Sequence, residues 1–523
     1  MTKARALYAL WIAGIVALFC LHFPHLLADF PNHSPWMDYS KYTDEGWYAD
    51  AAVRHFLIGH WYLHGDFNPA VALPVWPLLL AFVFHFTGVS LAAARAVIVS
   101  VLGLNLFLSY RVLRTQAPRW VALAAVTLLV SSPFLYAFSR LALQEPLVIG
   151  ILLLTWIQAL RLKNDAERRR PWRLIAIGLL LCLLLLTKTT GVFLLPSTLF
   201  LIGWACEFHL RSSLRALSIT IAAALVPACI WYFVLVRPHY RVDFTYLFEV
   251  NRWPQPAGIP AHLAAYWWSL RGVLWISPAL CILAAALLAC VFVPRRRQKG
   301  KDSAASDGFW SNPLTLASLL AASGYVVFAG MQNNPQPRYY ETVIYPVVFL
   351  AVLAAADLLA RFQSVSLRIA ACAPPAVMAA LCVAGAIRIA GYVRHPEYTW
   401  LNAATQLTRY IDGHPAPNHI LLSVSGDQIE LTTHLPSICD DYGTWDLPYR
   451  IHAYHPSWYA GWNEMDPGTL EDLTTQYSLE QVASFPAFDD PDRNVLLLYR
   501  LHPLPPPQQR YLAKEERLDN AGK

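Results

Sequence analysis

Long apolar segments recur along most of this 523-residue chain. They lie near residues 7–28, 91–111, 120–138, 146–161, 174–187, 191–208, 216–236, 272–293, 313–330, 341–360 and 369–390. A helix that crosses a bilayer needs about 20 mostly apolar residues. Only 14% of the residues are charged, against roughly 25% in soluble domains. The sequence therefore predicts a mainly α-helical, polytopic membrane bundle with about eleven spans.

A further apolar run, 71–87, is shorter and contains Pro74 and Pro77. Basic clusters decide its interpretation, because they lie mainly on the cytoplasmic side of a membrane. These clusters lie near 111–119, 161–170, 211–215, 295–301 and 361–368. All of them lie inside if the N-terminus is cytoplasmic and 71–87 does not cross. We therefore expect a re-entrant or interfacial helix at 71–87, within a first outer loop over 29–90.

The chain becomes more polar beyond residue 390. The segment "TWLNAATQLTRYI" has helical periodicity, and "ILLSVS" and "NVLLLYRL" are typical of strands. We expect two domains, a membrane-embedded domain over 1–390 and a small α/β domain over 391–523. With about eleven spans and a cytoplasmic N-terminus, the second domain is extracytoplasmic, and 237–271 forms another outer loop.

Ionisable residues beside the predicted spans are the first candidates for function, because charges there are costly to bury. Asp44 and Glu45 follow the first span. The pair also suits the first turn of a helix with Thr43 as its N-cap. Glu145 opens a predicted span, where an interfacial acid at a helix N-terminus is the alternative. Lys188 separates two apolar runs, and its alternative is a lysine that reaches out to the interface.

Arg140 lies in a short outer loop before Glu145. Arg338 and Tyr339 lie at another outer boundary, where an ordinary interfacial belt is the alternative. The expected topology places all these residues on one face of the membrane. A bundle can bring them around one cavity, with acids for a hydroxyl or sugar and cations for a phosphate. The histidines of the first outer loop match no zinc spacing, so no metal site is predicted. The basic clusters indicate membrane orientation rather than nucleic-acid binding.

The order of several motifs resembles a known family. The motifs are "YTDEGWYADAAV", "PLLLAFVFHFTGVSLAAARAV", "SSPFLYAFSRLALQEPLVIGILLL", "LTKTTGVFLLP" and "PRYYETVIYPVVFLAVLA". Together they resemble the GT-C membrane glycosyltransferases, in the branch of protein O-mannosyltransferases and lipid A aminoarabinose transferases. The resemblance covers about residues 1–390. It departs from the aminoarabinose transferases at "DFNPAVALP", where Asp66 or Asn68 stands near the position of a family acid.

The resemblance implies transfer of one sugar from a polyprenyl-phosphate donor, such as undecaprenyl phosphate, to a lipid, glycan or protein acceptor. The reaction would take place at the outer face of a bacterial inner membrane, among membrane lipids. A phosphate leaves without a general acid, so a single base suffices, and attack opposite the phosphate inverts the anomeric centre. No cofactor is firmly expected, and a divalent metal stays open.

The resemblance and the charges together give each candidate a role. Asp44 would be the base, and Glu45 would orient Asp44 or the acceptor. Glu145 would bind sugar or acceptor hydroxyls. The cations Lys188, Arg140 and Arg338 would hold the phosphate, with Tyr339 beside them. The alternatives are a non-catalytic assembly protein and a transporter or lipid flippase, with a solute path lined by Asp44, Glu145 and Lys188.

Overall fold

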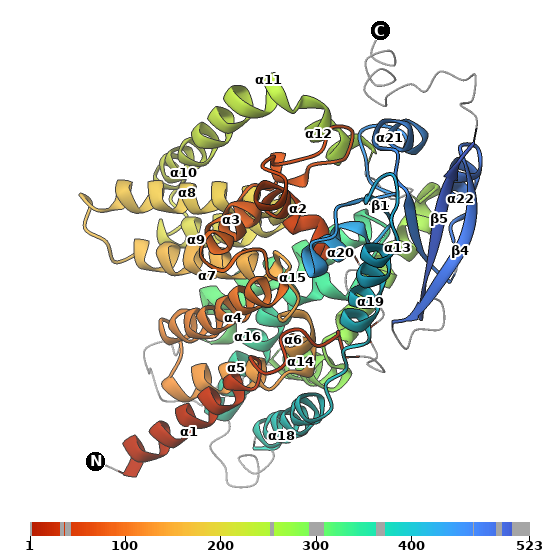
Figure 1. Ribbon diagram of the computed structural model, residues 1–523. Coiled ribbons are helices and arrows are strands. Elements are labelled where there is room, and N and C mark those ends of the chain that lie inside the picture. Colours follow the sequence, from red (N-terminus) through yellow and green to blue (C-terminus); the bar gives the residue numbers. More distant parts are fainter. Residues whose placement is uncertain are drawn as a thin grey trace, which may run out of the picture.

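The computed structural model describes residues 3–31, 36, 43–250, 256–291, 308–361, 372–463, 465–487 and 494–504. Helices make up most of the described residues, and a five-stranded sheet lies at one side of them in Figure 1. A mainly α-helical membrane bundle with a small C-terminal α/β domain is therefore confirmed.

Helices occur in all the apolar segments of the sequence. They are α1 (Lys3–Cys20), α4 (Leu91–Arg114), α5 (Arg119–Val130), α6 (Pro133–Phe138), α7 (Glu145–Leu162), α8 (Arg170–Thr187), α9 (Leu195–Ala205), α10 (Leu210–Trp231), α14 (Pro278–Val291), α15 (Pro313–Met331), α16 (Tyr340–Arg361) and α18 (Ala373–Arg394). Within the described ranges, eight helices are long and apolar enough to cross a membrane, or up to nine if a bent pair is one span.

Two of the expected spans are shorter than predicted. Segment 120–138 divides into α5 and α6, because Ser132 accepts a hydrogen bond from the Leu135 amide and Pro133 begins a new helix. Segment 191–208 is a 3-10 helix, η3 (Thr189–Leu194), followed by the 11-residue α9. Of the eleven expected spans, these two segments contain helices that are shorter than a bilayer-crossing helix. The other nine correspond to the eight long apolar helices and the bent pair among the described residues.

The segment 29–90, expected to be the first outer loop, includes α2 (Asp44–Leu57) and α3 (Val75–Thr87) among its described residues. The 13 residues of α3 extend roughly 20 Å, which is less than the ~30 Å hydrocarbon core of a bilayer. This helix packs against α2 and α4. The short length of α3 is consistent with the expectation that 71–87 does not cross the membrane, and that expectation stays a prediction.

The outer loop expected over 237–271 is more helical than predicted. It contains α11 (Arg237–His239), α12 (Arg241–Thr245) and α13 (Gly258–Gly272). The chain then bends by 108° between Gly258–Trp275 and Pro278–Val291. Most of the expected span 272–293 is thus the second helix of a bent pair, α14. The first helix of the pair, α13, lies where a loop was expected.

The C-terminal domain combines helices with a mixed sheet. Its elements are α19 (Thr399–Gly413), β1 (Leu421–Leu422), α20 (Gly426–Thr433), β2 (Ser437–Ile438), α21 (Leu447–Tyr454), β3 (Trp458–Trp462), α22 (Pro467–Thr474), β4 (Tyr477–Pro486) and β5 (Val495–Pro503). The strand order is β2-β1-β3-β5-β4. The pairs β1–β2 and β1–β3 are parallel, whereas β3–β5 and β4–β5 are antiparallel. The amphipathic α19 buries Trp400, Leu407 and Ile411 in the core of this domain.

The C-terminal domain is docked on the segment between α1 and α4. Helix α20 packs directly against α2, as Figure 1 shows. A second contact pairs Asp66 with Gly443 in an isolated antiparallel bridge, and the Trp445 amide donates to the Gly65 carbonyl at 3.0 Å. The two parts of the chain therefore meet at α2, the helix that begins with Asp44, and at the segment that follows it.

Candidate active site

Asp44 is the first residue of α2 and lies partly buried. Its Oδ1 accepts a hydrogen bond from Thr43 Oγ1 at 2.8 Å, and its Oδ2 is ion-paired with Nη1 of Arg338. The side chains of Asp44 and Arg338 remain 16% and 13% exposed. The structure thus brings together two predicted site residues from distant parts of the chain, and neither side chain is fully buried.

A second ion pair lies close to the first. Lys188 Nζ is paired with Glu145 Oε1, and both side chains are buried. The Lys188 ammonium lies 5.4 Å from the ring centroid of Tyr48 and 5.5 Å from that of Tyr339. The Arg338 guanidinium lies 5.2 Å from the same Tyr339 ring. Tyr339 therefore connects the two ion pairs through cation–π contacts.

Helix ends position these charged groups. Asp44 begins α2 and Glu145 begins α7, where the positive end of each helix dipole favours an acid. Lys188 follows α8 in an extended conformation that ends the helix. Arg338 lies in a 3-10 turn, η8 (Pro337–Tyr339), directly before α16. Since side chains from these four helix ends are in contact, the charges gather at one place in the structure.

Tyr48 contributes a neutral group to the same cluster. Burial raises the pKa of its phenol to about 12, so the phenol stays protonated at neutral pH. Its ring contacts Lys188, and its position one helical turn after Asp44 fixes it on the same face of α2. The cluster therefore has two cations, two partner carboxylates and two tyrosine rings.

Glu341 is a buried acid that is not among the site residues predicted from the sequence. It lies in the first turn of α16, and neither of its carboxylate oxygens has a hydrogen-bond partner among the described residues. It interacts electrostatically with Glu145 and Lys188. The signal in the sequence was an acid at the start of a predicted span, the same signal that identified Glu145.

Glu45 is fully buried, and its hydrogen-bond partners lie outside this cluster. Arg95 holds both of its oxygens, with Nε 2.7 Å from Oε1 and Nη2 2.5 Å from Oε2. The Ala142 amide donates to Oε1 at 2.7 Å, and Gln428 Nε2 donates to Oε2 at 3.2 Å. These contacts favour a structural role for Glu45, because its acceptor sites are already used by the protein.

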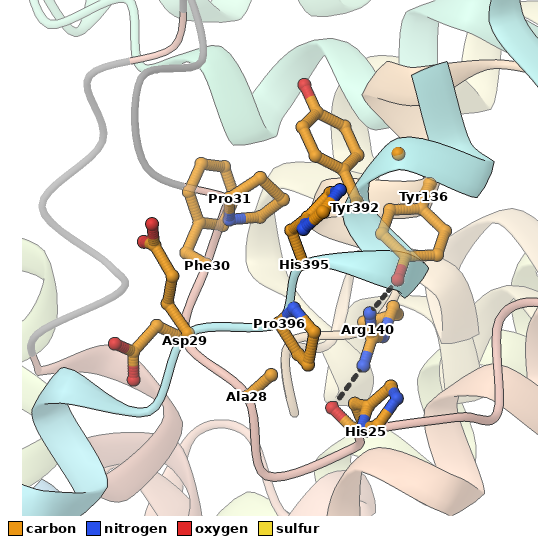
Figure 2. Close-up of a pocket in the computed structure, with 12 residues that line it drawn as sticks. His25, Ala28, Asp29, Phe30, Pro31, Tyr136, Arg140, Tyr392, His395 and Pro396 are labelled. Atoms are coloured by element: carbon orange, nitrogen blue, oxygen red, sulfur yellow. Dashed lines mark hydrogen bonds between the residues drawn. The ribbon is translucent and has the colours of Figure 1, made fainter. Parts of the chain in front are cut away.

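Arg140 has a separate set of partners. Its guanidinium donates to the Tyr136 hydroxyl and to the carbonyl oxygens of Pro24 and His25. Figure 2 shows it in a pocket with His25 and His395, between the first outer loop and the segment after α18. Of the three cations that the sequence analysis assigned to phosphate, Arg338 and Lys188 share contacts, whereas Arg140 ties the chain after α1 to the segment before α7.

Acidic residues gather at a second place, between α2 and α20. Asp50, Asp427 and Glu430 are the group of potential metal ligands among the described residues. Arg54 already lies among them, with Nε 2.8 Å from Asp50 Oδ1 and Nη2 3.4 Å from Asp427 Oδ1. Since a guanidinium already neutralises part of this charge, the cluster forms an ion-pair network without requiring a metal.

The fold and the gathered charges define a class of protein. The membrane domain has an acid, Asp44, at the start of α2, and the C-terminal domain packs against that helix. A family model described as dolichyl-phosphate-mannose-protein mannosyltransferase matches residues 69–231. No curated protein matches the chain by sequence.

Solved structures show the same fold over nearly the whole chain. ArnT from Cupriavidus metallidurans, bound to undecaprenyl phosphate, is 13% identical, with a TM-score of 0.61. The match covers 95% of this chain and 98% of ArnT. The oligosaccharyltransferase of Archaeoglobus fulgidus in its apo form is 12% identical, with a TM-score of 0.52 and coverage of 88% and 70%. The chain therefore has the GT-C fold, and the resemblance seen in its sequence is confirmed.

Proposed function

We propose that this protein is a membrane glycosyltransferase that moves a single sugar from a polyprenyl-phosphate donor to an acceptor outside the membrane. The observation that carries the proposal is the contact between Asp44 and Arg338, next to Lys188 and Glu145. An acid and two cations on a GT-C scaffold suit a reaction that takes a proton and releases a phosphate. ArnT, which shares the fold, has been solved with undecaprenyl phosphate.

Asp44 acts as the base in this proposal. The acceptor hydroxyl attacks the anomeric carbon, its proton passes to Asp44, and the bond between that carbon and the phosphate oxygen breaks. The electron pair of the broken bond stays on the phosphate. Attack from the side opposite the phosphate inverts the anomeric centre. The negative charge that Asp44 loses thus reappears on the leaving phosphate, so the net charge of the site is unchanged.

Arg338 and Lys188 hold the phosphate. In the structure, Arg338 is paired with Asp44 Oδ2. A donor phosphate that binds the guanidinium competes with this pair and makes the carboxylate oxygen available to the acceptor. Lys188, enclosed between Tyr48 and Tyr339, supplies a second positive charge in a poorly hydrated place, where it strongly stabilises the developing phosphate charge.

Glu145 and Glu341 provide acceptors for sugar hydroxyls. One oxygen of Glu145 and both oxygens of Glu341 have no hydrogen-bond partner among the described residues. Buried acceptors of this kind are costly unless a ligand or a proton satisfies them. We therefore assign these two acids to recognition of the substrate, and Glu45 and Arg140 to holding the site in shape.

The proposed orientation follows from the basic loops. The N-terminus is cytoplasmic, 71–87 does not cross, and the C-terminal domain is extracytoplasmic, so Asp44 faces the outer side. Cysteines introduced at Gly88 and Asp412 test this orientation with a membrane-impermeant maleimide on intact cells. Labelling at both positions supports it. Labelling that requires opened cells at both positions would reverse the topology and the side of the reaction.

Transfer is tested with purified protein in nanodiscs. Undecaprenyl-phosphate donors that carry different single sugars are each combined with lipid, glycan and peptide acceptors. The proposal predicts release of undecaprenyl phosphate for one donor, and a Lys188→Ala variant that binds undecaprenyl phosphate roughly 30-fold more weakly or worse, by ~2–5 kcal/mol. The exposed Lys163 provides the matched control, as Lys163→Ala. Equal binding by both variants would remove Lys188 from the phosphate site.

A further inference from the structure

The N-terminus of α2 lacks the local cap that its sequence predicts. Thr43 occupies the N-cap position, but its side chain makes no capping hydrogen bond in the described structure. Its hydroxyl instead donates to Asp44 Oδ1 at 2.8 Å. The first amides of a helix have no partner within the helix, so another group must satisfy them when they are buried.

Gln428 of the C-terminal domain supplies this partner. Its Oε1 accepts a hydrogen bond from the Gly46 amide at 2.7 Å, the role that an N-cap side chain normally has. Its Nε2 donates to Glu45 Oε2 at 3.2 Å. Gln428 is fully buried, and its side chain thus contacts both residues that follow Asp44.

The backbone of α20 lies unusually close to α2 at this point. A Cβ atom on Gly46 would lie 2.2 Å from the carbonyl carbon of Asp427 and 2.2 Å from the Gln428 amide nitrogen. Only glycine permits this approach, which brings the Gln428 side chain within reach of the helix end. About two turns further along α2, Arg54 Nη2 lies 3.4 Å from Asp427 Oδ1 and donates to the Ser437 carbonyl at 3.5 Å.

We propose that Gln428 is a positioning residue, which caps α2 from the C-terminal domain and so leaves the Thr43 hydroxyl to orient Asp44. This inference rests on the proposed function, in which Asp44 is the base. It makes the C-terminal domain part of the active-site architecture, although no side chain of that domain needs to touch the substrate. Loss of the cap allows Thr43 to turn to the Gly46 amide and release Asp44.

The test uses Gln428→Met, which keeps the length of the side chain and removes both hydrogen bonds. Gln476→Met is the matched control, because Gln476 is also buried in this domain but donates to the Pro448 carbonyl, at 3.0 Å. Hydrogen exchange of the nanodisc-embedded full chain is expected to be about fivefold or more faster over 43–50 in Gln428→Met only. Equal protection of this peptide in wild type and Gln428→Met would overturn the capping role.

Catalysis separates positioning from a general loss of structure. For the sugar donor that wild type uses, Gln428→Met should lower kcat about tenfold or more and leave the binding of undecaprenyl phosphate unchanged. A wild-type kcat in Gln428→Met contradicts the inference, as does an equal loss of kcat and of phosphate affinity.

The same experiment distinguishes failure of the proposed function. If Asp44→Asn is inactive while Gln428→Met matches wild type in exchange and in kcat, only the role of Gln428 is wrong. If Asp44→Asn transfers sugar as well as wild type, the role of Asp44 is wrong, and the exchange data still decide whether Gln428 caps α2.

Discussion

Asp44 and Glu45 are adjacent in the sequence but have different surroundings. Successive residues of a helix point about 100° apart, so one can face a substrate while the other faces the protein. The sequence indicated that this acidic pair mattered, and it assigned both residues to the site. It could not separate them, because the partners that distinguish them, Arg338 for Asp44 and Arg95 for Glu45, lie far away along the chain.

Replacement of Glu45 should mainly reduce stability. Glu45→Gln leaves the buried Arg95 without its charged partner, which costs about 3 kcal/mol in comparable buried pairs. We expect a lower midpoint of thermal unfolding in detergent and lower expression. Glu471→Gln, at an exposed position of α22, is the control. A Glu45→Gln protein with the stability of wild type and no transfer activity would instead support a direct role in the reaction.

Arg338 and Arg140 should differ in their effect on the donor. Arg338→Gln removes a guanidinium that contacts Asp44 and the Tyr339 ring, and we expect binding of undecaprenyl phosphate to weaken about tenfold or more. Arg140→Gln loses contacts to backbone carbonyls and to Tyr136, so its affinity for undecaprenyl phosphate should remain within about twofold of wild type. Isothermal titration of both variants decides the assignment. The reverse order of affinities would return Arg140 to the phosphate site.

At the level of helices and strands, long periodic segments were predictable and interrupted ones were not. The span at 341–360 corresponds closely to α16, whereas 120–138 divides at Pro133. The strand-like segment "ILLSVS" contributes only the two residues of β1 to the sheet. Apolar composition determines whether a segment is buried, but caps, prolines and tertiary partners determine where a helix or strand ends.

Gly46 tests the contact between α2 and α20. In Gly46→Ala, the new Cβ would lie 2.2 Å from the α20 backbone, so the two helices must separate. We expect the C-terminal domain to become more sensitive to protease and the transfer rate to fall about tenfold or more. Gly391→Ala in α18 meets nothing within 4 Å and is the control. Equal protease resistance in the two variants would show that α2 and α20 do not need this close approach.

For the molecule as a whole, the sequence predicted a membrane bundle and a small C-terminal domain, and both are present. It did not predict how they dock, because docking depends on contacts such as Gln428 with Gly46 and Arg54 with Asp427. These pairs are more than 370 positions apart in the chain, and each residue taken alone looks ordinary. The same holds for the candidate site. The charged residues beside the spans could be identified from the sequence, but which of them form ion pairs could not.

The interface between the two parts should weaken as pH rises. Burial raises the pKa of Glu430 to about 8, above its ordinary value, although Arg54 opposes this shift. The folded protein therefore keeps a proton that the unfolded chain has released, so the free energy of unfolding falls between about pH 5 and pH 8. Asp50 and Asp427 face the same guanidinium, and burial raises their pKa values too.

Glu430→Gln removes one source of this dependence. We compare the free energy of unfolding of the variant with that of wild type at each pH. At pH 8 this difference should be more favourable to the variant, by roughly 1 kcal/mol or more, than it is at pH 5. Thermal unfolding of the purified full chain at pH 5, 6.5 and 8 measures the difference. A constant difference between wild type and variant at all three values would mean that Glu430 does not titrate in the folded protein.

The most direct test of the account is the rate of sugar transfer by Asp44→Asn. An amide has the shape of the carboxylate but cannot take the acceptor's proton. With purified protein and the undecaprenyl-phosphate sugar that wild type uses, we predict a loss of about 10²–10⁴-fold in kcat. Folding, measured by thermal unfolding, and binding of undecaprenyl phosphate should persist. Transfer by Asp44→Asn at the wild-type rate would contradict the central claim and leave Asp44 as the first residue of an ordinary helix.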